Sequence, residues 1–173
     1  MGANSMLPND ISIFLAQTVD TDFHARFSAL DRSYVYYIHN HPQPAATLAG
    51  LTTWVNFELD ASAMHTSAQA LLGEQNFSAF RSSQCQSHSR HRFVSNITVS
   101  RHGDLIMIQI TANAFLHHMV RNIVGSLIEV GRGSQDISWM GDLLAGEDRT
   151  KAGVTAPPDG LYLCRVRYPE QYQ

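Results

Sequence analysis

The stretch Asn113-Ala-Phe-Leu-His-His-Met-Val-Arg-Asn-Ile-Val-Gly125, continued by Ser-Leu-Ile-Glu-Val-Gly131, decides how the rest of the chain is interpreted. At about 100° per residue its apolar side chains share one broad arc, which predicts a helix with a buried face. Arg121 lies at the border of that arc, with Gly125 one turn further on. Because a guanidinium keeps its charge, it needs a carboxylate, a phosphate or water. Arg121 therefore either snorkels to solvent or is held at a cleft to pair with an acidic group or a phosphate.

The composition restricts the possible classes of protein. The chain has 173 residues, 44% of them hydrophobic and 16% charged, which is enough for one domain with its own core. Its net charge of -3 gives no global bias toward nucleic acid, so such binding requires a local basic patch. Nine histidines are a weak indication of RNA binding, because they add positive charge at mildly acidic pH.

The sequence also bears on the compartment. Cys85 and Cys164 form no recognisable redox or metal pattern, which favours a reducing compartment. The alternative is a single disulfide between them. No apolar run approaches the roughly 20 residues of a membrane span, and the first residues lack the basic and apolar regions of a signal peptide. We therefore expect a cytoplasmic protein with no membrane association.

The hydrophobic pattern predicts an α+β fold with a mainly antiparallel sheet flanked by helices. Strands are expected at 10–15, 33–39, 93–100, 105–110 and 161–168. Gly103 is expected at the turn of a hairpin. Further helices are expected at 60–72, with Asp60 as N-cap and Gly73 as the stop, and at 137–144. The polar, proline-bearing stretches 42–51 and 151–160 are the expected mobile loops.

Two clusters could carry chemistry by themselves. Cys85-x-x-His88-x-x-His91 has the residue types of a zinc site, but the arginines between them would repel a dication, so we expect no metal. The same segment reads better as a loop that presents Arg90 and Arg92 to phosphates, or as an ordinary solvated loop. The pair His117-His118 could act as acid and base, but no nucleophile motif accompanies it, which favours backbone hydrogen bonding and RNA contact.

Several longer segments, taken in order, carry a family resemblance. They are Asp22-Phe-His-Ala-Arg-Phe-Ser28, Arg32-Ser-Tyr-Val-Tyr36, Leu71-Leu-Gly-Glu-Gln-Asn-Phe77, the run from Asn113 to Gly125, Asp148-Arg-Thr150 and Gly160-Leu-Tyr-Leu163. With these segments the chain resembles the second half of the bacterial tRNA pseudouridine synthase A family over nearly its whole length.

The resemblance implies a fold, an activity and partners. It implies the C-terminal half of a pseudouridine synthase fold, with residues 1–24 leading from an N-terminal domain and 25–173 forming the C-terminal α/β domain. The implied activity isomerises uridine to pseudouridine on the 3′ side of the tRNA anticodon stem-loop. The C1′–N1 bond is broken and the uracil is rejoined through C5, without metal or organic cofactor. The implied partners are tRNA and a second copy of the chain in a homodimer.

The resemblance also implies roles for individual residues. Tyr34 would pack on the target uracil, Leu161 would form an apolar wall beside the base, and Arg121 would pair with the catalytic aspartate. Candidate RNA contacts, inferred from charge and position, are Arg32, Arg81, Arg90, Arg92, His117, His118 and Asn122. An aromatic ring at a cleft suits this chemistry because it can stack on an extruded base.

The sequence departs from the family pattern at the nucleophile. The expected Gly-Arg-Thr-Asp string does not occur, and Glu147-Asp-Arg-Thr150 lacks its order and its glycines. We therefore expect a fragment that is inactive alone and can still bind tRNA. The alternative is an RNA-binding domain without catalytic function.

Overall fold

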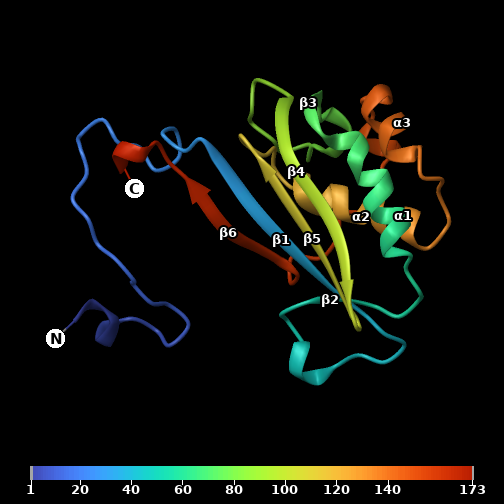
Figure 1. Ribbon diagram of the computed structural model, residues 1–173, viewed down its shortest axis with the longest axis horizontal. Coiled ribbons are helices and arrows are strands. Elements are labelled where there is room, and N and C mark those ends of the chain that lie inside the picture. The colour runs from blue at the N-terminus through green and yellow to red at the C-terminus, as the bar shows by residue number, and fades with distance from the viewer. Residues whose placement is uncertain (1, 173) are drawn as a thin grey trace.

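The structure is a computed structural model that describes residues 2–172, and its centre is one sheet of six strands (Figure 1). The strand order is β2-β1-β5-β4-β3, and β6 pairs with β1 on the edge that β2 also occupies. The β1–β2 pair is parallel and the other pairs are antiparallel, so the predicted α+β class with a mainly antiparallel sheet is confirmed. The strands are β1 (Asp31–Asn40), β2 (Thr53–Val55), β3 (Gly73–Asn76), β4 (His91–His102), β5 (Leu105–Ala112) and β6 (Leu161–Arg167).

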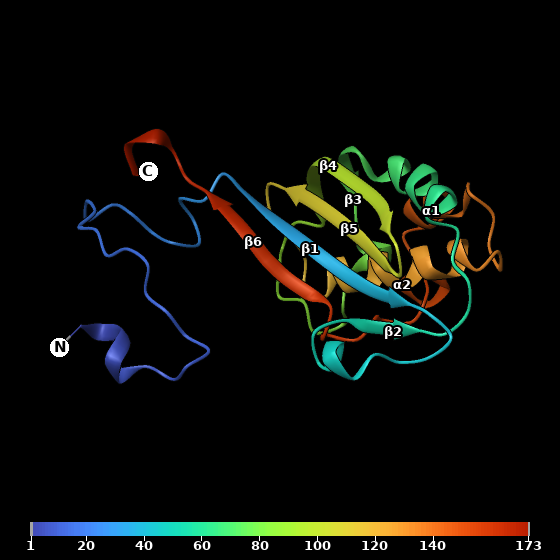
Figure 2. The same ribbon diagram turned by 60° about the horizontal axis from the view of Figure 1, so that its bottom comes forward.

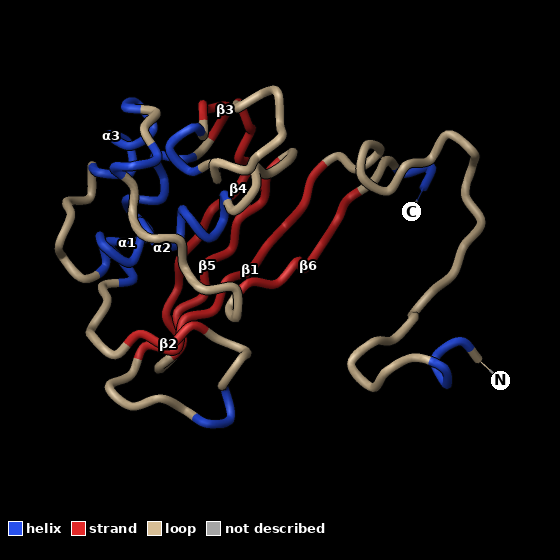
Figure 3. Tube along the Cα trace, turned by 180° about the vertical axis from the view of Figure 1, so that it is seen from behind, coloured by secondary structure: helices blue, strands red, loops and turns tan. Residues whose placement is uncertain are grey.

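Three helices cover one face of this sheet, as the tilted view of Figure 2 and the view from behind in Figure 3 show. They are α1 (Ala61–Ala68), α2 (Met119–Gly131) and α3 (Trp139–Gly146). Short 3-10 helices lie at Ala3–Met6, Ala46–Leu48, Gln69–Leu71, Ser78–Phe80, Arg149–Lys151 and Glu170–Tyr172. Within residues 2–172, no helix has the length and apolar character needed to cross a membrane.

The core lies between the sheet and α2. Along β5 the isoleucines at 106, 108 and 110 are buried, whereas the residues between them are exposed or half-buried on the opposite face. This alternation follows from the two-residue repeat of a strand and is visible in the sequence. The buried side of α2 closes the layer with Ile123, Val124 and Leu127.

The local signals of the sequence are confirmed where they concern caps and turns. The Asp60 carboxylate accepts hydrogen bonds from the backbone N–H groups of Ser62 and Ala63, at 2.8 and 2.9 Å, and so caps α1. Gly73 has φ +85° at the end of the helical segment, and Gly103 has φ +59° between β4 and β5. Both positions favour glycine because other residues are strained there.

Two element predictions are wrong. Residues 10–15 form no strand, because among the described residues no neighbouring strand pairs with them. The helix predicted from Asn113 begins only at Met119, since His118 has a left-handed backbone with φ 61°, and residues 113–118 form a loop. The loop is held by the Asn113 side-chain oxygen, which accepts from the N–H of Phe93 at 3.0 Å.

The N-terminal segment extends away from the sheet and helices (Figures 1 and 3). Ring contacts with the rest of the chain begin at Phe23, whose centroid lies 5.1 Å from that of Tyr168 and 5.0 Å from that of Tyr172. Before this point Phe14 and Leu15 are exposed. The division of the chain at residue 24 remains a prediction.

The segment 149–160, here called the strap, crosses α2 on its way to β6. A Cβ atom added to Gly125 would lie 1.8 Å from the Val154 carbonyl oxygen, and one added to Gly153 would lie 2.7 Å from the Gly125 carbonyl oxygen. The Gly153 N–H also donates to the Ser126 hydroxyl at 3.0 Å. The stretch expected to be a mobile loop is therefore packed backbone to backbone against α2.

This contact predicts opposite effects for two helical glycines. Gly125→Ala should destabilise the fold by about 2 kcal/mol or more, because the new methyl group overlaps the strap backbone. Gly141→Ala in α3 should stabilise it by up to about 1 kcal/mol, because its Cβ would meet only the Ala70 side chain at 3.8 Å. Urea unfolding of both variants measures the difference, and equal stability of the two would refute the close contact.

Candidate functional site

Tyr34 and Leu161 lie on the same face of the sheet, on adjacent strands. Leu161 is opposite Tyr36 in the β1–β6 register and Leu163 is opposite Tyr34, so these side chains form one apolar wall. The Tyr34 ring meets the Phe115 ring edge to face, with centroids 5.0 Å apart. The structure therefore brings together the two residues predicted to hold the base, and it adds Phe115 as a brace.

Arg121 lies in the first turn of α2, half-buried, and is held by the strap. Its Nε donates to the Ala156 carbonyl at 2.7 Å, and the Ala156 N–H donates to the Arg121 carbonyl at 3.1 Å. Within residues 2–172 its terminal nitrogens have no hydrogen-bond or ion-pair partner. Its positive charge is one of the causes that lower the pKa of His118, and it partly offsets the rise in the pKa of Tyr36. Arg121 therefore lies between the start of α2 and β1. The side chain is thus held in place while its end stays available to an anion.

A cleft of about 870 Å³ opens beside Tyr34, and we call it the Tyr34 cleft. Among residues 2–172, no acidic side chain lines it. Its charged, titratable and aromatic lining residues are Arg26, Arg32, Tyr34, Cys85, Arg92, Phe115, His117 and His118. A cleft with this lining suits a polyanion that also carries an aromatic base.

A second cleft, of about 450 Å³, lies between the segment after Phe80, the start of α2 and the strap. We call it the Arg81 cleft. It too has no acidic lining residue in the described part of the chain, and His118 contributes to both clefts. Its other polar lining residues include Arg81, Ser82, Asn122, Arg149 and Thr155. Arg121 and Leu161 line neither cleft and lie instead around Tyr36.

Four of the predicted RNA contacts have side chains that are free to bind. Arg81 and Arg90 make no side-chain hydrogen bond or ion pair among residues 2–172, and Arg90 is exposed. The rings of His117 and His118 stack with centroids 3.9 Å apart. Burial, the His117 ring and the Arg121 charge all lower the pKa of His118. His118 therefore favours its neutral form more than an ordinary histidine does.

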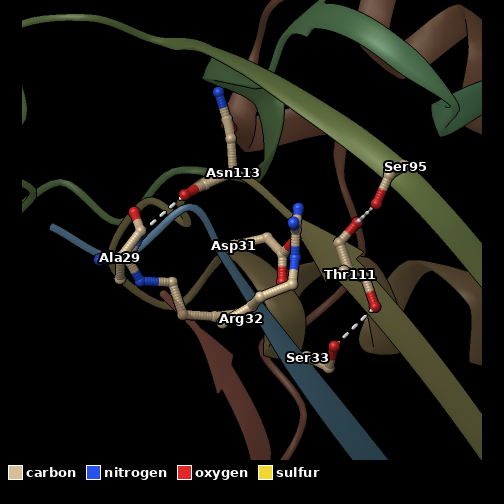
Figure 4. A network of polar contacts seen from close by, with 8 residues as sticks. Ala29, Asp31, Arg32, Ser33, Ser95, Thr111 and Asn113 are labelled. Atoms are coloured by element: carbon tan, nitrogen blue, oxygen red, sulfur yellow. Dashed lines mark hydrogen bonds and ion pairs between the residues drawn. The ribbon is translucent and has the colours of Figure 1, made fainter. Parts of the chain in front are cut away.

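Arg32 uses its guanidinium to hold the chain before β1. Its Nη1 donates to the carbonyls of Asn113 at 2.7 Å and Ala29 at 3.1 Å, the network drawn in Figure 4. Its Nη2 donates to the Arg26 carbonyl. Because both terminal nitrogens donate to backbone oxygens, this arrangement favours a structural role for Arg32, which is to hold the chain before β1.

Arg92 and Asn122 are likewise engaged within the fold. Arg92 is 9% exposed and donates to the His91 carbonyl at 2.6 Å and the Ser87 hydroxyl at 2.7 Å. Burial is the main cause that lowers its pKa. Asn122 is 1% exposed, and its amide donates to the Phe80 carbonyl at 2.7 Å. Both side chains therefore hold the loops around them, and each also lines a cleft, Arg92 the Tyr34 cleft and Asn122 the Arg81 cleft.

Cys85 takes part in a backbone contact. Its sulfur accepts from the His117 N–H at 3.4 Å. Burial raises its pKa, but backbone N–H groups of His117 and Ser87 and the charges of Arg81 and Arg92 together bring the pKa below the usual range. Within the described part of the chain, no group of three or more His, Cys, Asp or Glu side chains is arranged to hold a metal ion.

Three further residues of this region are not predicted from the sequence. Phe115 belongs to the stretch with helical spacing that starts at Asn113, and its position beside Tyr34 depends on the loop before α2. Arg26 lies in the segment from Asp22 to Ser28, whose charge could have flagged it. Arg149 lies in Asp148-Arg-Thr150, a motif recognised without a role for its arginine.

Comparison with known proteins gives concordant matches. A family model described as tRNA pseudouridine synthase matches residues 67–169. The chain is 54% identical to tRNA pseudouridine synthase A of Yersinia pseudotuberculosis over 172 residues, which is 99% of this chain and 65% of that protein. It is 52% identical to tRNA pseudouridine synthase A of a Shewanella species (strain MR-4), over 100% of this chain and 66% of that protein. The chain thus spans about 65% of the length of these curated relatives.

The geometry predicts a pH-dependent contribution of Tyr36 to stability. The Tyr36 hydroxyl donates to the Pro157 carbonyl at 2.7 Å and contacts the Thr53 hydroxyl, and burial raises its pKa to about 12. Because an unfolded tyrosine ionises near pH 10, its contribution is complete below about pH 10 and is lost as the pH rises toward 12.

Tyr36→Phe should therefore lower the free energy of unfolding by about 1 kcal/mol at pH 7 and reduce the loss of stability above pH 10. Denaturant unfolding across this pH range measures both effects. Tyr37→Phe, on the opposite face of the sheet, is the control. If wild type and Tyr36→Phe lose stability equally above pH 10, the assignment is wrong.

Proposed function

The chain belongs to the tRNA pseudouridine synthase family, and on that premise we propose that it forms the base-binding and arginine side of a tRNA-modifying site. The proposed reaction isomerises uridine to pseudouridine on the 3′ side of the anticodon stem-loop. The observation that carries the proposal is the arrangement of Tyr34, Leu161 and Arg121 next to clefts with basic but no acidic lining residues.

The apolar wall would hold the extruded base. A uracil that leaves its stack needs an aromatic or apolar surface to replace the lost contacts. Tyr34 offers such a surface, because Phe115 fixes its ring from the side and Leu161 continues the wall along β6.

Arg121 would hold the catalytic carboxylate in its charged form. A carboxylate in a closed apolar pocket is protonated unless a positive group lies close to it. The terminal nitrogens of Arg121 suit this role, because the strap holds the side chain through Nε alone. No carboxylate among residues 2–172 forms an ion pair with Arg121, and the sequence has no Gly-Arg-Thr-Asp string. We therefore propose that the chain is inactive until a separate segment supplies the aspartate.

The RNA backbone would follow the two basic clefts. Phosphate contacts give affinity and position without reading sequence. The proposed contacts are Arg81, His117 and His118, which line the clefts, and the exposed Arg90 directly before β4. Arg32, Arg92 and Asn122 hold the loops that carry them. We further propose that the working protein is a homodimer, uses no metal or organic cofactor and acts on tRNA in the cytoplasm.

A reconstitution assay tests the catalytic proposal. The chain is incubated with an anticodon stem-loop transcript, alone and together with a separately produced segment of a relative that carries the aspartate motif. Pseudouridine should form only in the mixture, and Arg121→Lys should reduce its rate by roughly 100-fold, because the carboxylate loses its fixed partner. Arg132→Lys, at the opposite end of α2, should leave the rate unchanged.

The outcomes separate the two candidate functions. Pseudouridine made by the chain alone would contradict the missing carboxylate. An inactive mixture that still binds the transcript would favour the alternative, an RNA-binding domain without catalysis.

The salt dependence of RNA binding tests the proposed phosphate contact of Arg81. Arg81→Gln should weaken binding of a labelled stem-loop about equally for different sequences, and the slope of log affinity against log salt should fall by about 1. Fluorescence anisotropy at several salt concentrations measures both quantities. Arg132→Gln is the control, and an unchanged salt slope for Arg81→Gln would exclude a phosphate contact at this position.

A further inference from the structure

Arg149 and Thr155 have no part in the proposed chemistry, yet they link the strap to the helix that carries Arg121. We infer that Arg149 is a positioning residue, which acts through Asn122 and Thr155 to keep the strap where it orients the Arg121 guanidinium. The consequence for catalysis rests on the proposed function of Arg121. The orientation of the Arg121 side chain, in contrast, can be measured in this chain without any activity.

The direction of the Arg121 side chain depends on one backbone oxygen. Its Nε donates to the Ala156 carbonyl at 2.7 Å, and no carboxylate among residues 2–172 forms an ion pair with the guanidinium. A shift of Ala156 therefore moves the acceptor that fixes the plane of the guanidinium. The place of the strap decides where the free end of Arg121 points.

A closed polar network lies directly beside this contact. Arg149 Nη2 donates to the Thr155 hydroxyl at 3.0 Å and to the Asn122 side-chain oxygen at 3.1 Å. The Thr155 hydroxyl in turn donates to the same Asn122 oxygen at 2.7 Å. Asn122 follows Arg121 on α2, and Thr155 precedes Ala156 on the strap. The network thus joins the immediate neighbours of the two residues whose contact orients the guanidinium.

The polar network fixes the position of Thr155 along α2. Gly125 and Gly153 let the strap approach α2 closely, and the Gly153 N–H donates to the Ser126 hydroxyl at 3.0 Å, but neither contact holds the Thr155 side chain. The Asn122 side chain is anchored, because it is 1% exposed and its amide donates to the Phe80 carbonyl at 2.7 Å. Directional hydrogen bonds from this anchor fix the position of Thr155 along the helix.

The chemistry of the network requires an arginine. The planar guanidinium reaches Thr155 and Asn122 with one nitrogen and the Ala152 carbonyl with the other, at 3.4 Å. A lysine ammonium has no such fork. Within residues 2–172 Arg149 has no acidic partner, since Asp148 accepts from the Thr150 N–H and hydroxyl at 2.9 and 2.7 Å. The charge of Arg149 is therefore used to hold neutral groups in place.

NMR of the 15N-labelled chain tests the inference directly. The Nε–H signal of Arg121, identified by its loss in Arg121→Lys, reports the hydrogen bond to Ala156 through its exchange with solvent. Arg149→Lys and the near-isosteric Thr155→Val should each speed this exchange by roughly fivefold or more, as expected for loss of a hydrogen bond. Thr155→Val keeps the test valid if Arg149→Lys does not fold.

Arg101→Lys is the matched control. Arg101 also donates to an asparagine side-chain oxygen, that of Asn40 at 2.6 Å, and to the Leu59 carbonyl at 2.6 Å, but it belongs to β4. Its replacement should lower overall stability without changing the exchange of the Arg121 signal. Unchanged exchange in Arg149→Lys and Thr155→Val, or equal acceleration in Arg101→Lys, would overturn the inference.

Activity measurements then separate positioning from substrate binding. In the reconstituted assay, Thr155→Val should lower kcat with little change in KM, because a misdirected Arg121 affects the reacting groups rather than RNA affinity. A raised KM with unchanged Arg121 exchange would show instead that the network serves the RNA backbone in the Arg81 cleft, and would overturn the inference. If the mixture has no activity at all, the proposed function fails, while the exchange data still decide the positional claim.

Discussion

The backbone contact between α2 and the strap is the constraint on which the rest of the site depends. A side chain at Gly125 would put its Cβ 1.8 Å from the Val154 carbonyl oxygen, so this approach is possible only without one. It brings Ala156 near enough to exchange two hydrogen bonds with Arg121. Arg121 is therefore oriented by main-chain groups, which leaves its terminal nitrogens for an anion.

The sheet forms the other side of the site, and here strand pairing positions the side chains. Antiparallel pairing of β1 with β6 puts Tyr34 and Leu161 on one face, although they are far apart in the sequence. The charges are segregated as well, since a chain of net charge -3 lines two neighbouring clefts with basic and no acidic side chains. Local fields, not net charge, decide whether such a surface attracts a polyanion.

The sequence predicts best what depends on short-range pattern. The alternating isoleucines of β5 and the cap at Asp60 are visible as spacing and residue type. The left-handed backbone of His118 is not, and it moves the start of α2 from the expected position at Asn113 to Met119. Charge alone also cannot reveal that the terminal nitrogens of Arg32 are engaged by backbone carbonyls. The role proposed for Tyr34 rests on the family resemblance, since a tyrosine in a strand has no distinctive pattern.

The central claim is that a uridine of the anticodon stem-loop packs against the wall formed by Tyr34 and Leu161. Photo-crosslinking tests it most directly, with 4-thiouridine in place of a single uridine on the 3′ side of the stem-loop and mass spectrometry to locate the bond. The account predicts attachment at Tyr34 of β1, in the loop 113–118 or at Leu161 of β6. Attachment confined to the exposed face of the sheet, or to the N-terminal segment before Phe23, would contradict it.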